Sequence, residues 1–326
     1  MVAIGLSAGA VARVRFALSC LWEVVASVRV LRDPGHHALH LPWVNRMRPR
    51  LAAAGLLDPD GGLLGQLVPA APGYVVDFLT PPPVGLSPDL EQELTALRAT
   101  EPGTVRTHLD LRPGPRSPAL AALYADPGAG LRWLAEEIEA YWRLALAADW
   151  PRIRAVLDAE VFHRARRLAE DGAAGLLNDL HERVRWEGDA LLINQRHCAA
   201  PDVPAGAGLV LVPSVFVWPS VLSIAAGDVS QLAYPARGAG ALWECPPSAP
   251  EALGAVLGRG RARLLAELDA PRSTTELARR TGLSPAGVSQ HLTTLRAAGL
   301  VVTHRQGRSL LSSRTAVAEA LLSASR

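Results

Sequence analysis

Residues 273–312 begin with residues that are typical of the start and the end of a short helix. Ser273, followed three residues later by Glu276, has the pattern of a capping box, in which each side chain bonds the backbone N–H of the other residue. A helix is therefore expected to begin near Thr274. Gly282 then stands where a helix commonly ends in a left-handed residue, so this helix is expected to be short.

A second set of helix signals follows at once. Ser284 is a favoured N-cap residue, and Pro285 occupies the first helical position, where its missing N–H costs nothing. Val288, Leu292 and Leu295 then recur at helical spacing and are expected to face the core. Two helices joined by so short a turn must cross steeply, so the second helix projects from the domain.

The apolar period changes after the second helix. Residues 300–304 and 309–312 form two short strand-like runs, and Gly307 between them can adopt the positive φ of a tight turn. Arg305 and Arg308 stand at the two shoulders of this expected hairpin. Two crossed helices followed by a hairpin are typical of a winged helix-turn-helix, in which the hairpin is the wing. We therefore interpret both arginines as phosphate contacts rather than as solvated turn charges.

This pattern predicts an interface with double-stranded DNA that is read mainly by the second helix. Gln290 is the best candidate for a base contact, because Gln can bond N6 and N7 of adenine in the major groove. Gly287 either allows close approach to the DNA backbone or is simply a glycine that the helix tolerates, and the two interpretations are equally good. His291 suits either core packing or a phosphate contact. The predicted DNA-binding residues are Thr274, Ser284, Gly287, Ser289, Gln290, His291, Thr293, Arg305 and Arg308.

The segment from residue 264 to residue 311 resembles the winged-helix domain of the ArsR-like bacterial repressors. The resemblance is carried by STTELARRTGLSPAGVSQHL, by LRAAGLV and by a Gly-Arg wing. It implies a homodimer that binds a near-palindromic operator and represses transcription. Metal-sensing members carry cysteines in the helix before the turn, whereas residues 276–281 contain none, so no metal site is expected there.

The distribution of charge agrees with DNA binding. All 33 basic residues are Arg, and residues 251–326 hold 11 of them against 5 Asp and Glu, for a net charge of +6. Residues 1–250 carry a net charge of −4. A basic C-terminal part on a mildly acidic body is the asymmetry that an electrostatic DNA interface predicts.

Length and composition bound the remaining possibilities. A chain of 326 residues, 49% of them hydrophobic, is long enough for two or three globular domains. The three cysteines lack metal-ligand or redox spacing and are expected to be reduced thiols of a cytoplasmic protein. Residues 203–227 contain no charge but three prolines, so we expect strands there rather than a membrane span. No cofactor and no membrane partner are expected.

The expected fold class is α+β, with a mostly helical N-terminal domain that includes a small antiparallel sheet, followed by the winged helix. We expect an N-terminal domain over residues 1–245, a linker over 246–251 and a DNA-binding domain over 252–326. Ser19 and Ser87 are expected to cap helices. Expected helices cover residues 20–32, 40–54, 87–98 and most of 117–180, expected strands cover 11–18, 183–187, 190–194, 209–218 and 230–234, and residues 56–86 are expected to be loop.

The function of the N-terminal part is less constrained. SCLWEVVASVRVLRDPGHHALHLPW and LVLVPSVFVWPSV resemble an uncharacterised domain that precedes ArsR-like winged helices in GC-rich Gram-positive bacteria, and this resemblance implies no known activity. His36 and His40 have a spacing that suits a metal site, but no nearby residues complete a ligand set, so solvated or capping roles are favoured. No hydrolase, phosphate-loop or dinucleotide motif occurs, so we do not expect an enzyme.

Five tryptophans of this part have two interpretations. Trp133, Trp142, Trp186, Trp218 and Trp243 suit either core packing or the lining of an apolar effector pocket. Domain size and aromatic content lead to the hypothesis of a small-molecule effector that changes operator affinity. The expected function is a dimeric transcription regulator. The alternatives are an enzyme or a protein-binding module that uses the winged helix for dimerisation or targeting.

Overall fold

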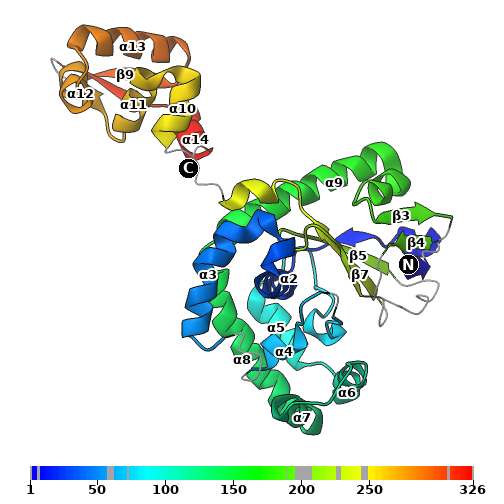
Figure 1. Ribbon diagram of the computed structural model, residues 1–326. Helices are drawn as coiled ribbons and strands as arrows, with labels where there is room; N and C mark the ends of the chain where they lie inside the picture. The colour runs from blue at the N-terminus through cyan, green and yellow to red at the C-terminus, as the bar shows by residue number, and fades with distance from the viewer. Residues whose placement is uncertain are drawn as a thin grey trace. The chain divides into compact units, whose positions relative to one another are not determined.

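The computed structural model describes residues 2–5, 8–56, 62–71, 73–188, 190–194, 208–224, 229–243, 249–306 and 309–324 (Figure 1). The chain divides into two compact units, Met1–Trp243 and Glu244–Arg326, and each unit is described by itself. The N-terminal unit is mostly helical with two small sheets, and the C-terminal unit is a winged helix-turn-helix. The predicted α+β fold class is confirmed.

Two sheets of different kinds lie in the N-terminal unit. A three-stranded antiparallel sheet has the order β1 (Val2–Gly5), β4 (Ala190–Ile193), β3 (Val184–Glu187). A four-stranded sheet has the order β2 (Arg15–Phe16), β5 (Gly208–Ser214), β7 (Val229–Pro235), β6 (Leu222–Ile224). In this sheet β2, β5 and β7 run parallel, and β6 is antiparallel to β7. Nearly every residue of β5 and β7 is buried, as expected of parallel strands covered on both faces.

One helix, α2 (Cys20–Arg32), forms the centre of this unit, and 11 of its 13 residues are buried. It contacts β5, α3 (Leu41–Ala53), α5 (Leu90–Arg98) and α8 (Pro127–Ala145), as Figure 1 shows. The other helical elements are α1 (Ala8–Val11), α4 (Leu63–Leu67), α6 (Pro102–Asp110), α7 (Pro118–Ala125), α9 (Trp150–Asn178) and the 3-10 turns η1 (Pro34–His36), η2 (Ala38–His40), η3 (Asp77–Leu79) and η4 (Ala239–Trp243).

Two side chains fix the N-terminus of α2. Ser19 is its N-cap, as predicted. The Glu93 carboxylate of α5 accepts hydrogen bonds from Ser19 Oγ at 2.6 Å, from Cys20 N at 2.6 Å and from Leu21 N at 3.1 Å. A carboxylate in this position satisfies backbone donors that the helix leaves unpaired and interacts favourably with the helix dipole. The contact therefore fastens α5 to the central helix.

Several other predictions for the N-terminal unit are confirmed. The helices predicted over residues 20–32, 40–54 and 117–180 correspond to α2, α3 and the run α7 to α9. Gly172 interrupts α9 with a φ of 68°. The strands predicted over residues 183–187 and 190–194 form β3 and β4, paired as an antiparallel hairpin.

Predictions of three local elements are wrong. Residues 11–18 hold only the two-residue strand β2, because the residues before it form α1 and a turn. Ser87 does not cap α5; Asp89 does, in a reciprocal capping box with Gln92 at 2.8 and 3.0 Å. Residues 56–86 are not all loop, since they contain α4 and η3.

Two further differences concern residues 215–218 and α6. Residues 215–218, predicted as strand, form a bend and a turn. The backbone N–H of Val215 donates to the Glu23 carboxylate at 3.0 Å. This N–H is therefore not available to pair with a neighbouring strand. Helix α6, which begins at Pro102, was not predicted.

The charge-free segment and the cysteines are only partly described. No helix of the described residues is long and apolar enough to cross a membrane. In the described part of the segment, residues 208–224, the regular elements are β5 and β6. Cys20 is a free thiol inside the core, and burial raises its pKa. Cys198 and Cys245 lie outside the described residues.

The buried carboxyl of Glu23 makes the stability of this unit depend on pH. Burial raises the pKa of Glu23 to about 8 from an ordinary value of 4.5, so folding favours the protonated form. The resulting stabilisation is complete below the ordinary pKa and is lost as the pH rises through the folded pKa. We therefore expect Glu23→Gln to remove a slope of up to about 1.4 kcal/mol per pH unit in the free energy of unfolding between these two values.

Tryptophan fluorescence during urea unfolding measures this slope in the N-terminal unit alone, because all 8 tryptophans lie in residues 1–243. The amide of Gln keeps an acceptor for Val215 N, so the variant is a conservative one. Parallel pH profiles for the wild type and the variant would contradict the prediction.

The C-terminal unit contains five helices and a three-stranded antiparallel sheet among its described residues. The order along the chain is α10 (Ala249–Leu257), α11 (Arg259–Glu267), β8 (Arg272–Ser273), α12 (Thr274–Thr281), α13 (Pro285–Ala297), β9 (Val301–Gln306), β10 (Ser309–Arg314) and α14 (Ala316–Ala324), and the sheet order is β8-β10-β9. Residues 249–251, predicted as linker, begin α10. Helix α14 was not predicted. It packs against α10 through Leu322 and Leu253.

Candidate nucleic-acid interface

Both helices of the helix-turn-helix start at the predicted serine caps. Ser273 Oγ accepts a hydrogen bond from Glu276 N at 3.2 Å, and Ser284 Oγ accepts one from Gly287 N at 3.1 Å. The Glu276 carboxylate pairs with Arg272 Nη1 at 2.6 Å instead of returning to the backbone of Ser273. A guanidinium is a stronger partner for a carboxylate than a neutral N–H, so only half of the predicted capping box forms.

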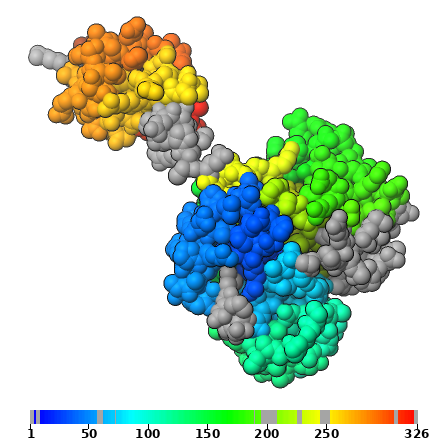
Figure 2. Space-filling model, in the orientation of Figure 1, coloured from blue at the N-terminus to red at the C-terminus, as the bar shows by residue number. Residues whose placement is uncertain are grey.

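The turn between the helices fixes how α13 is presented. Gly282 ends α12 with a φ of 70°, as predicted, and Leu283 packs against the core of the unit. On α13, Val288, Leu292 and Leu295 are buried, as predicted. The opposite face of α13 is therefore exposed. Figure 2 shows α12 and α13, in orange, as a large part of the visible surface of this unit.

Polar side chains occupy this exposed face. Ser284, Ser289, Gln290 and Thr293 are all exposed. Thr293 Oγ1 donates to Ser289 O at 3.0 Å and accepts from Arg296 Nη2 at 3.1 Å, so its hydroxyl is already oriented. The Gln290 side chain forms no hydrogen bond with any described residue, which leaves its amide available to a base edge.

Three other predicted site residues are more enclosed. Gly287 is half-buried, and a Cβ there would lie 3.2 Å from Ser284 Oγ, so glycine avoids crowding at the cap. His291 is half-buried, and a Cβ on Gly260 of α11 would lie 2.8 Å from its Nε2. This close approach favours the packing interpretation of His291. Thr274 is half-buried at the first position of α12.

The predicted wing is an antiparallel hairpin of β9 and β10. Arg305 is exposed on β9 and stands opposite Leu310 of β10. Gly307 and Arg308 lie outside the described residues. The third strand, β8, pairs with β10 and was not predicted. Because Ser273 ends β8 and also caps α12, this strand ties the wing directly to the helix-turn-helix.

Most of the acidic residues in this unit are used in ion pairs. Arg272 pairs with Asp269 and Glu276, Arg280 with Glu267, and Arg314 with Glu319. The arginines that form no ion pair with a described residue are Arg259, Arg261, Arg263, Arg279 and Arg296. Arg279 and Arg296 belong to α12 and α13 themselves and were not among the predicted contacts. Their position in the last turns of the two helices was the available signal.

Comparison with known families agrees with this geometry. A family model for a helix-turn-helix domain matches residues 261–304, from α11 into β9. A second model, for a family of unknown function (DUF5937), matches residues 89–240 of the N-terminal unit. No curated protein and no solved structure matches the chain. The fold and this match identify a helix-turn-helix domain in the C-terminal unit, which indicates a DNA-binding transcription regulator.

The two histidines singled out from the sequence have structural contacts. His36 and His40 lie in separate 3-10 turns and do not share a helix face. His36 Nδ1 pairs with Asp33 at 2.8 Å on the surface, whereas buried His40 Nδ1 accepts from Trp243 Nε1 at 2.8 Å. Burial lowers the pKa of His40 to about 4, which keeps the ring neutral. The described residues hold no cluster of three or more potential metal ligands.

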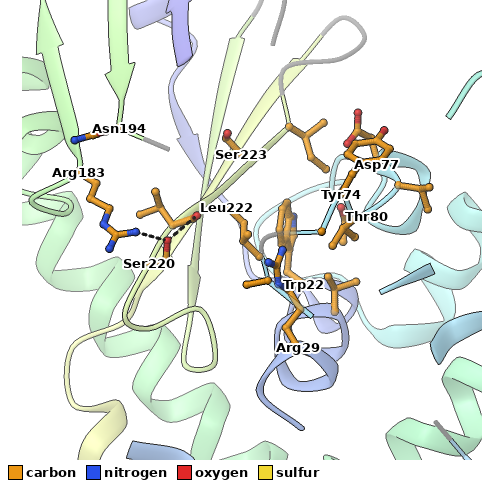
Figure 3. A pocket seen from close by; sticks show the side chains of 17 residues that line it. Trp22, Arg29, Tyr74, Asp77, Thr80, Arg183, Asn194, Ser220, Leu222 and Ser223 are labelled. Carbon is orange, nitrogen blue, oxygen red and sulfur yellow. Dashed lines mark hydrogen bonds between the residues drawn. The ribbon is translucent and has the colours of Figure 1, made fainter. Parts of the chain in front are cut away.

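A cavity of about 620 Å³ in the N-terminal unit is a second candidate site (Figure 3). Trp22 is the tryptophan that lines it, and none of the five tryptophans singled out from the sequence does. Trp142 instead packs edge-on against Trp150, and Trp243 packs against Phe216. For these two residues the core-packing interpretation is confirmed.

Proposed function

We propose that this protein is a sequence-specific, ArsR-like transcriptional repressor that binds a near-palindromic operator as a homodimer. The observation that carries the proposal is the exposed polar face of α13 in a unit with a surplus of arginines. Phosphate contacts by those arginines would supply affinity without sequence preference. Contacts from α13 to base edges would supply the preference.

The proposed docking places α13 in the major groove, with the N-terminus of the helix nearest the DNA. Ser284 and Ser289 are short enough for close approach to the backbone, and Gln290 reads an adenine through its amide. Arg305 on the wing contacts phosphate beside the groove. Arg279 and Arg296, at the ends of the two helices, add further phosphate contacts.

The proposed homodimer uses a surface formed by α10 and α14. Val256 of α10 is 81% exposed, and Val317 and Leu321 of α14 are 59% and 37% exposed. Large apolar side chains gathered on neighbouring helices favour contact with another protein surface. A second copy places a second α13 against the second half-site of a palindrome, because protein and operator then share a two-fold axis.

Phosphate binding by the wing has a measurable consequence. We expect Arg305→Ala to lower the slope of log affinity against log salt concentration by about 0.9 for each phosphate that the wing no longer neutralises. It should weaken binding to operator and to unrelated duplex by similar factors, because a phosphate contact carries no sequence information.

Fluorescence anisotropy over a salt series measures this slope, and titration at high DNA concentration gives the number of chains per duplex. Arg132→Ala, which removes an exposed arginine from α8 of the N-terminal unit, is the matched control and should leave the slope unchanged. An unaltered slope in Arg305→Ala would show that Arg305 of the wing does not contact phosphate. One chain per duplex would rule out the dimer.

A further inference from the structure

The cavity of the N-terminal unit has three walls from distant parts of the chain. Trp22, Val25 and Arg29 lie three and four residues apart on α2, so they share one helix face. Residues 73–80 form a second wall, and residues 220–224, which include β6, form the third. Figure 3 shows Trp22 and Arg29 between these two walls. A volume of about 620 Å³ lies within the usual range for small-molecule sites.

The apolar part of the cavity is held in place by hydrogen bonds behind it. Trp22 Nε1 donates to Gln231 Oε1 at 3.0 Å, and Gln231 Nε2 donates to Thr80 O at 2.7 Å. This chain of buried contacts connects α2, β7 and the segment after η3. The indole ring is therefore a fixed wall, and Leu222 and Ile224 of β6 also line the cavity. A rigid apolar surface loses little conformational entropy when a ligand binds to it.

Arg29 is the unusual group in this cavity. It forms no ion pair with any described residue. The acidic residue that acts on it is Asp33, one helical turn away, whose carboxylate is bonded to His36. The side chain of Arg29 is half-buried, and this burial lowers its pKa. A partly desolvated guanidinium that forms no ion pair is unfavourable, and a bound anion would compensate for the lost hydration.

Other polar groups lie along the same cavity. Ser223 Oγ is buried and has no hydrogen-bond partner among the described residues. At the far end, Arg183 Nη1 donates to Ser220 Oγ at 3.1 Å, as Figure 3 shows. Asp77 also lines the cavity, and burial raises its pKa to about 6. Two arginines against one carboxyl leave the lining positive, so it favours an anion over a cation.

We propose that this cavity binds a small molecule with one anionic group and an apolar body, in which Arg29 pairs with the anion and Trp22 packs against the body. Leu222 and Ile224, which lie on the same face of β6, cover the apolar part of the ligand. This ligand class makes specific the small-molecule effector hypothesised from the sequence, and its regulatory role rests on the proposed regulator. The binding itself takes place within the N-terminal unit and does not require DNA.

The test is calorimetric titration of the full chain, without DNA, with phenylacetate, indole-3-acetate, octanoate and phenyl phosphate. Phenylacetamide, indole-3-acetamide and octanamide are the uncharged counterparts. We expect at least one anion to bind, with its uncharged counterpart much weaker. The carboxylates and the phosphate ester then show which anionic group the site prefers.

Variants of Arg29 distinguish the contact with the anion from nonspecific hydrophobic binding. Arg29→Gln is expected to weaken the bound anion by about 30-fold or more, because one partner of an enclosed charge pair is removed. Arg29→Lys should restore part of the affinity, since it keeps the charge but lacks the paired geometry of the guanidinium. Arg132→Gln, an exposed change on α8, should bind like the wild type. Leu222→Trp, which fills the cavity but leaves Arg29 in place, should also abolish binding.

Three results would overturn the proposal: no anion of the panel binds, amides and anions bind equally, or Arg29→Gln and Leu222→Trp both bind like the wild type. The same proteins are then titrated with operator DNA in a separate anisotropy assay. Loss of DNA binding with intact anion binding would contradict the regulator and leave this site standing. Intact DNA binding without anion binding would contradict the anion site and leave the proposed regulator unaffected.

Discussion

Replacing Gln290 by Glu is expected to weaken operator binding by about 100-fold or more, equivalent to about 3 kcal/mol. Two effects combine. The variant lacks the amide that bonds adenine, and it brings a negative charge to the helix face nearest the phosphates. Gln290 is exposed and its side chain bonds no described residue, so the folding of the unit should be unaffected. Anisotropy with operator DNA measures the weakening, and far-ultraviolet circular dichroism checks the fold.

Two companion variants show which effect is responsible. Gln290→Ala removes the amide alone and should cost about 1–3 kcal/mol, with relaxed preference at a single base pair. Ala270→Glu adds the same charge on the exposed turn between α11 and β8 and should change affinity little. Wild-type operator affinity in Gln290→Glu would mean that α13 does not lie in the groove. Equal weakening of operator binding in Ala270→Glu and Gln290→Glu would show that the added negative charge, and not the loss of the amide contact, is the cause.

Replacing Arg164 by Met is expected to lower the free energy of unfolding of the N-terminal unit by about 3–5 kcal/mol. Arg164 Nε pairs with Glu160 Oε1 at 2.6 Å, and Arg164 Nη1 pairs with Asp179 Oδ2 at 2.7 Å. Arg164 and Glu160 are 3% and 1% exposed. Glu160 would keep only its contact with Arg237, at 2.8 Å, and would become an incompletely paired buried charge.

The same region offers a surface ion pair as the control. Arg166 pairs with Glu170 at 2.8 Å on the exposed side of α9. Arg166→Met should therefore lower the free energy of unfolding much less than Arg164→Met, because water and salt screen an exposed ion pair. Urea unfolding followed by tryptophan fluorescence reports on this unit alone. Similar small decreases in both variants would show that the buried network contributes no more than a surface pair.

The winged helix was predictable because its signals are local. Ser273, Gly282 and Ser284 act within a few residues of themselves, and the structure places each of them as predicted. Strand β8 was missed because it has only two residues, and its pairing partner β10 lies almost forty residues further along. The enclosed position of His291 depends on Gly260 of another helix, which helix periodicity alone does not reveal.

The N-terminal unit was less predictable because its main contacts are distant in sequence. Residue 15 of β2 pairs with residue 210 of β5, and β5 pairs in parallel with β7, whereas alternating patterns suggest only that strands exist. The cavity is assembled from α2, residues 73–80 and residues 220–224. Trp22 was not singled out, because its position is fixed by Gln231, more than two hundred residues away.

Recognition of a specific DNA sequence is the property on which the proposed function depends. The most direct measurement compares binding of the full chain to DNA from upstream of its own gene with binding to a scrambled duplex of the same length and composition, at one physiological salt concentration. We expect a preference of about 1,000-fold or more for the upstream DNA. Equal and weak binding to the two duplexes would contradict it.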